Sequence, residues 1–86
     1  RVDNRAALSE LYAKYEVLSR TLSDYRAMSI NCNEAMGLIN KALDAGALNL
    51  VEYLTEVEAL YSVEEQRIAV ERDFHLTVAG INAILL

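Results

Sequence analysis

The chain has 86 residues, a formal net charge of −5 and no proline, and 53% of its residues are hydrophobic. The acidic balance and the lack of any Lys/Arg cluster argue against a nucleic-acid-binding surface or a basic membrane-surface helix, because both need concentrated positive charge. Charged residues recur every few positions, so no apolar run approaches the roughly 20 residues that a membrane-spanning helix needs.

The first predicted element is a helix from about residue 4 to about residue 45, with Asp3 or Asn4 as its N-cap. Apolar residues recur in it at alternating spacings of three and four, which is typical of a coiled-coil seam and predicts left-handed supercoiling. Ser29 and Cys32 weaken the middle of this seam, so tighter packing is expected on either side of them. The seam comprises Leu8, Leu11, Tyr15, Leu18, Leu22, Tyr25, Ser29, Cys32, Met36, Ile39 and Leu43.

A turn is predicted over about residues 46–49. Gly46 follows the last residue of the periodic run, and glycine is favoured just after a helix because it adopts positive φ at little cost. Asn49 suits the N-cap of the next helix, and Glu52 three residues later completes a capping box. Leu48 and Tyr53 have the spacing of a hydrophobic staple. The chain therefore reverses direction here.

The second predicted helix runs from about residue 50 to about residue 85, and its apolar face is wide. A seam is predicted to begin with Leu50, Leu54, Val57 and Tyr61, with Tyr53 and Leu60 as a flank. After the polar residues 64–67 the apolar set resumes with Ile68, Val70, Phe74, Leu76, Val78, Ile81 and Ile84. Such a face indicates contact with more than one neighbouring helix. The predicted fold class is all-α, an antiparallel two-helix hairpin with coiled-coil packing.

No group of residues in the sequence predicts catalysis. His75 is the only histidine, so paired-histidine metal sites and Ser-His-Asp chemistry both lack members. Cys32 lies in the seam, where a buried thiol behaves as a small apolar residue. The sequence therefore predicts no enzyme, no catalytic or metal-binding residue and no cofactor. An enzyme remains a third alternative, which would need catalytic groups beyond this chain.

A spaced set of residues surrounds the turn and continues along the second helix: Gly46, Asn49, Glu52-Tyr53-Leu54, Leu60-Tyr61 and Asp73-Phe74. This stretch, from Gly46 to about Phe74, resembles the TolC-type outer-membrane efflux factors. In that family a helix ends in glycine and a short turn leads to Ser or Thr, where Asn49 stands here. The next helix then reads acidic-x-Leu, a Leu-Tyr or Leu-Leu pair, and an aromatic residue. Thr55 stands where some members carry a second acid.

The resemblance implies a homotrimeric channel in the outer membrane of a Gram-negative bacterium, with long helices forming a tunnel through the periplasm for the export of small molecules. This chain would be one periplasmic hairpin of that tunnel. Its tip, formed by Gly46, Ala47, Leu48 and Asn49, would bind a periplasmic adaptor (membrane fusion) protein and, through it, an inner-membrane pump. Glu52 matches an acidic position that lines the constricted pore entrance in some members.

An alternative is a generic coiled-coil module for oligomerisation or scaffolding, in which hairpins dimerise or form a four-helix bundle. Because the chain begins inside a helical pattern, we expect it to be a segment of a longer protein. Flanking sequence would separate the two hypotheses, since the efflux channel requires amphipathic strands and a second hairpin. In both cases the isolated hairpin is expected to self-associate, because its apolar faces exceed what one partner helix covers.

Overall fold

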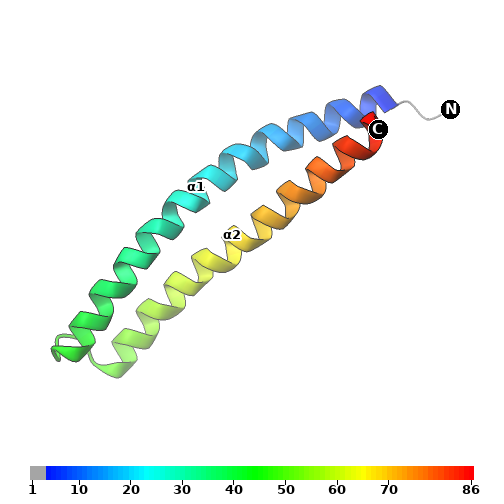
Figure 1. Ribbon diagram of the computed structural model, residues 1–86. Helices are drawn as coiled ribbons and strands as arrows, with labels where there is room; N and C mark the ends of the chain where they lie inside the picture. The colour runs from blue at the N-terminus through cyan, green and yellow to red at the C-terminus, as the bar shows by residue number, and fades with distance from the viewer. Residues whose placement is uncertain (1–3) are drawn as a thin grey trace.

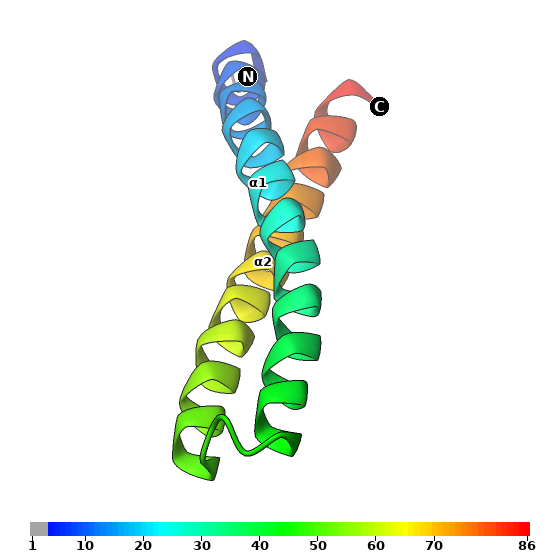
Figure 2. The ribbon, with the colours of Figure 1, turned by 90° about the vertical axis from the view of Figure 1, so that its left-hand side faces the viewer.

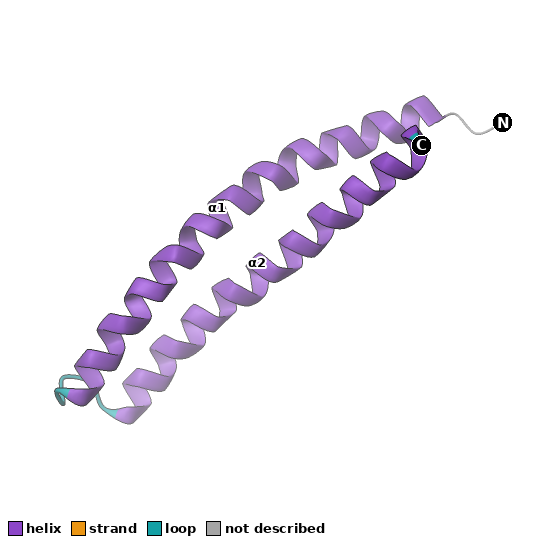
Figure 3. Ribbon diagram, in the orientation of Figure 1, coloured by secondary structure: helices purple, strands orange, loops and turns teal. Residues whose placement is uncertain are grey.

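The computed structural model describes residues 4–86, which form two long helices joined by a short turn (Figure 1). Helix α1 spans Asn4–Asp44 and helix α2 spans Leu50–Leu85. The helices run antiparallel, and the described residues contain no strand (Figure 3). The molecule is a rod with extents of 66 × 18 × 17 Å. The predicted all-α hairpin is therefore confirmed.

The helix ends lie close to the predicted positions. The first residue of α1 is Asn4, and the other predicted cap residue, Asp3, lies outside the described residues. The helix ends at Asp44, one residue earlier than predicted, because Ala45 already belongs to the turn. At the far end of the rod, α2 packs closely on α1. A Cβ atom added to Gly80 would lie 3.4 Å from Leu11 Cδ1.

The contact face of α1 is the predicted seam. Its members are buried or half-buried, except that Tyr15 stays 38% exposed. Leu22 is the most buried of the hydrophobic core residues, with 2% of its surface exposed. The rings of Tyr15 and Phe74 meet across the helices with centroids 5.3 Å apart. In the view of Figure 2 the two helices cross near mid-length.

The contact face of α2 differs from the predicted seam. Leu50, Leu54 and Tyr61 are 61%, 53% and 58% exposed and lie outside the contact with α1. Tyr53 and Leu60, which were predicted as a flank, lie in the face that contacts α1 instead. The prediction was wrong because this face also includes charged residues, which a search for apolar periodicity does not detect. All members of the observed seam are buried or half-buried: Tyr53, Val57, Leu60, Glu64, Arg67, Glu71, Phe74, Val78 and Ile81.

Few side chains of the described residues are withdrawn from solvent. Ser29 and Cys32, at mid-length, are only half-buried. The buried residues lie on both sides of them, as the weak middle of the α1 seam predicts. These are Leu22, Val57, Thr77 and Ile81.

Candidate functional site

Backbone hydrogen bonds from residues of the turn close the end of α1. Gly46 has a φ of +76°, the left-handed conformation that glycine adopts without steric cost. Its N–H donates to the carbonyl oxygen of Leu43 at 3.1 Å, and the N–H of Ala47 donates to the carbonyl oxygen of Ala42 at 2.8 Å. This pair of bonds is a Schellman motif, which satisfies carbonyl groups that a helix end leaves free. The predicted turn role of Gly46 is confirmed.

A capping box begins α2. The Asn49 side-chain oxygen accepts a hydrogen bond from the Glu52 N–H at 2.8 Å, and the Glu52 carboxylate accepts one from the Asn49 N–H at 3.0 Å. Asn49 has extended backbone angles, with φ −83° and ψ 170°, as an N-cap residue requires. The predicted cap is confirmed, and both helix ends at the turn are fixed by local bonds.

Tyr53 ties the first turn of α2 back to α1. Its hydroxyl donates to Asn40 Oδ1 at 2.8 Å, across the hairpin. Tyr53 and Leu48 are both half-buried, which fits the predicted staple. The turn is therefore held by side chains as well as by backbone bonds.

The tip of the rod presents small and apolar groups. Gly46, Ala47 and Asn49 are exposed and Leu48 is half-buried, so the structure brings the four predicted partner-binding residues together at one end. That end lies opposite the start of α1 and the end of α2 (Figure 1). Val51, which the sequence did not single out, is 74% exposed next to them. A partner that approaches the rod end-on meets these residues first.

The turn end of the hairpin is acidic. Glu52 is exposed, and its Oε1 atom belongs to the capping box. Asp44, Glu56 and Glu58 are also exposed, and no ion pair within residues 4–86 includes any of these four carboxylates. A basic residue in the last turn of α1, Lys41, is nearby in sequence. Negative charge at this end is therefore largely uncompensated by the hairpin itself.

A polar network joins the helices at mid-length. Ser29 Oγ on α1 donates to Glu64 Oε1 on α2. Arg67 donates to Glu64 Oε2 through Nε at 3.2 Å and Nη2 at 3.1 Å, and to Glu71 Oε2 through Nη1 at 3.1 Å. Arg26 on α1 donates to Glu71 Oε1 through Nη2 at 3.0 Å. The five side chains form a continuous series of hydrogen bonds, two links of which join α1 to α2.

The network lowers the pKa of both glutamates. The hydrogen bond from Ser29 is the largest cause of the lowered pKa of Glu64, and hydrogen bonding to Arg67 comes next. The hydrogen bond from Arg26 is the largest cause of the lowered pKa of Glu71. Each donor stabilises the ionised carboxylate, so the network favours charged glutamates in the folded state.

The sequence marked Ser29 as a weak point and residues 64–67 as a polar break, but it did not pair them. The pairing follows from the turn. Asn40 bonds Tyr53, and eleven residues further from the turn on each helix Ser29 bonds Glu64. Counting equal numbers of residues along both helices from the predicted turn would therefore have predicted this contact.

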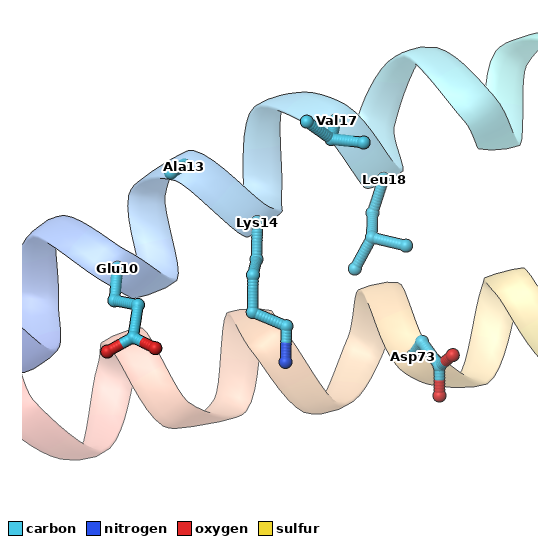
Figure 4. A pocket seen from close by; sticks show the side chains of 6 residues that line it. All are labelled: Glu10, Ala13, Lys14, Val17, Leu18 and Asp73. Atoms are coloured by element: carbon cyan, nitrogen blue, oxygen red, sulfur yellow. The ribbon is translucent and has the colours of Figure 1, made fainter.

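An open groove of about 430 Å³ lies beside α1 near the far end of the rod (Figure 4). Lys14 and Leu18 extend from α1 toward α2 in this view. The charged groups of the lining are those of Glu10, Lys14 and Asp73, and it includes no histidine, cysteine or hydroxyl group. The groove is lined by Glu10, Ala13, Lys14, Val17, Leu18 and Asp73.

The remaining candidates for chemistry lie apart from one another. His75 is exposed, with its ring centroid 5.7 Å from that of Phe74, and Cys32 is half-buried in the α1 seam. Among residues 4–86, no three His, Cys, Asp or Glu side chains gather where they could hold a metal ion. Neither helix, over its described length, combines the length and hydropathy that crossing a membrane requires.

No protein-family model, curated protein or solved structure matches this chain. The geometry of the turn and of the exposed faces is therefore the basis for assigning a function.

Proposed function

We propose that this chain is a periplasmic hairpin of an outer-membrane efflux channel, where it forms part of the tunnel wall and docks an adaptor protein through its turn. The supporting observation is the turn itself. A Schellman motif and a capping box fix residues 46–49 at the end of a rod 66 Å long. A docking tip needs this rigidity, because an ordered surface loses less entropy when a partner binds.

The four tip residues have two roles in this proposal. Ala47 and Leu48 contact the adaptor, since one is small and exposed and the other offers a half-buried apolar side chain. Gly46 and Asn49 fix the backbone that presents them. The hairpin acts mechanically, as wall and gate. An inner-membrane pump, reached through the adaptor, supplies the energy for transport, so the hairpin needs no catalytic residue or cofactor.

Glu52 lines the tunnel entrance in the proposed homotrimer. Its capping bond to the Asn49 N–H holds one carboxylate oxygen in place, while the residue remains exposed. Repeated around a ring of hairpins, Glu52 and the neighbouring Asp44, Glu56 and Glu58 form an acidic collar. The absence of ion pairs to these four carboxylates within residues 4–86 supports this role.

The test is a Leu48→Asp change in the full-length channel, expressed in a Gram-negative host that lacks its own efflux channel. Loss of drug resistance is expected with an unchanged amount of channel in the outer membrane, because a charge at the tip opposes apolar docking. Leu48→Met is the matched control and keeps resistance. Full resistance in the Leu48→Asp strain contradicts the proposal.

A second candidate is a coiled-coil oligomerisation module. It is favoured by the small core, since the buried hydrophobic residues of the described chain are Leu22, Val57 and Ile81. In this case further copies cover the exposed apolar side chains, and the 86-residue chain self-associates. Analytical ultracentrifugation at rising concentration tests this, and a monomer throughout the range counts against it.

A further inference from the structure

The outer face of α2 carries apolar side chains that α1 leaves uncovered. Leu54, Tyr61 and Ile68 are 53%, 58% and 58% exposed. They are seven residues apart, about two helical turns, so they lie in line along the helix. We call these three residues the outer stripe.

The heptad spacing of the outer stripe fits a helix as its partner. A helix that supercoils around α2 stays aligned with side chains that repeat every seven residues, whereas an extended chain does not. Helix α1 is not that partner. It packs on the neighbouring face of α2, where Arg26 bonds Glu71 and Asn40 bonds Tyr53.

Glutamates flank the outer stripe at each step. Glu58 lies four residues after Leu54 and three before Tyr61, and Glu65 lies likewise between Tyr61 and Ile68. Side chains at these spacings are neighbours on a helix surface. Both glutamates are exposed, and neither joins an ion pair within the described residues. Residues 50–66 contain five glutamates and no lysine or arginine.

The hairpin also exposes more surface than a compact protein of its mass. Its accessible surface is 6408 Å² at 9.6 kDa. A compact globular chain of that mass exposes about 5,100 Å². The excess is larger than the roughly 800 Å² that one partner contributes to an ordinary stable interface. There is thus enough uncovered surface for a further helix.

We infer that the outer stripe binds an amphipathic helix of another protein, whose apolar heptad positions are flanked by lysine or arginine. Charges beside an apolar seam select the partner in coiled coils. Two copies of the stripe pair poorly, because an antiparallel arrangement about Tyr61 brings Glu58 of one copy near Glu65 of the other. A basic helix instead neutralises both glutamates. This inference depends on the face of α2 and not on the efflux proposal, and self-association of the hairpin then uses other apolar positions.

Two synthetic peptides of three heptads test the inference, both with leucine at the seam positions. One carries arginine at the flanking positions and the other carries glutamate. Fluorescence anisotropy with the 86-residue chain measures affinity, and amide chemical shifts locate the contact. The arginine peptide is expected to bind over residues 54–68, with affinity falling about tenfold in high salt because exposed charges are screened. The glutamate peptide is expected not to bind.

Substitutions in the 86-residue chain show which residues contribute to the affinity for the arginine peptide. Tyr61→Ser is expected to weaken binding of the arginine peptide about thirtyfold, since buried aromatic residues dominate interfaces. The double change Glu58→Gln and Glu65→Gln is expected to weaken it about fivefold. Leu38→Ser is the matched control, because Leu38 on α1 is 66% exposed but lies off the stripe. It changes affinity less than twofold, and circular dichroism checks that all variants stay helical.

Several results overturn the inference. They are equal binding of both peptides, binding of neither, or chemical-shift changes away from residues 54–68. A further contrary result is that Tyr61→Ser reduces self-association of the chain while peptide binding is absent, which makes a second copy the occupant of the stripe.

Discussion

The turn and the mid-length network hold the same two helices together by different physics. At the turn, the helix-capping bonds join residues at most six apart, and each of them involves at least one backbone group. In the network, side chains join residues 35 and 45 positions apart, Ser29 to Glu64 and Arg26 to Glu71. Backbone bonds are indifferent to pH and salt, whereas paired charges respond to both. The turn fixes the direction of the chain, and the paired charges of the network make the contact between the helices sensitive to solution conditions.

Among changes at the turn, Gly46→Val is expected to cause the largest loss of unfolding free energy. Open space surrounds the position, so the cost comes from the positive φ alone, which disfavours a side chain by about 1–2 kcal/mol. Urea denaturation measures the free energy of unfolding. Gly37→Ala is the control, because it lies in open space inside α1 and is expected to stabilise by about 1 kcal/mol. If Gly46→Val is as stable as the parent chain, the Schellman motif is not what closes α1.

Asn49→Ala is expected to lose about 1 kcal/mol of unfolding free energy, since the Glu52 N–H loses its side-chain acceptor. Thermal denaturation followed by circular dichroism measures the loss. Asn49→Asp keeps an acceptor at the cap and serves as the control, with stability close to that of the parent chain. An equal loss in both variants would show that the cap bond contributes little.

The mid-length network is expected to make the smallest of these contributions to the free energy of unfolding. Its contribution depends on pH. The folded pKa values of Glu64 and Glu71 lie below the ordinary value of 4.5, so the unfolded chain takes up protons first as pH falls. Their stabilising contribution is complete above that value and is lost as pH drops through the lowered folded pKa values. Both side chains are part-exposed, so solvent screening keeps the contribution small.

Urea midpoints at pH 7 and pH 3 measure this loss. The double variant Glu64→Gln and Glu71→Gln is the reference, because its other acidic groups are those of the parent chain. The parent chain is expected to lose more stability on acidification than the double variant does. Identical pH profiles for the two proteins would mean that the network does not couple folding to protonation.

The turn could be predicted because each of its signals acts within a few residues. Gly46, Asn49 and Glu52 meet partners that are their near neighbours in sequence, so spacing alone identifies them. The seam of α1 was found for a related reason, since its members are regular and nearly all apolar.

The seam of α2 could not be found from apolar periodicity. Three of its members, Glu64, Arg67 and Glu71, are charged, while Tyr61 repeats just as regularly and stays exposed. Which stripe faces α1 depends on contacts between the helices, and the charged members bond to each other and to groups on α1 such as Ser29. The spacing of apolar residues within α2 alone therefore does not show which of its faces contacts α1.

The short-range bonds at the chain reversal also lead us to expect a particular order of folding. Because Ala42, Gly46 and Asn49 find their partners locally, the tip can form before distant residues meet. Each pair further out then closes only a small additional loop, so we expect helix pairing to proceed stepwise from the turn toward the two chain ends. Shortening both arms equally from those ends is expected to leave the folding rate of the tip nearly unchanged.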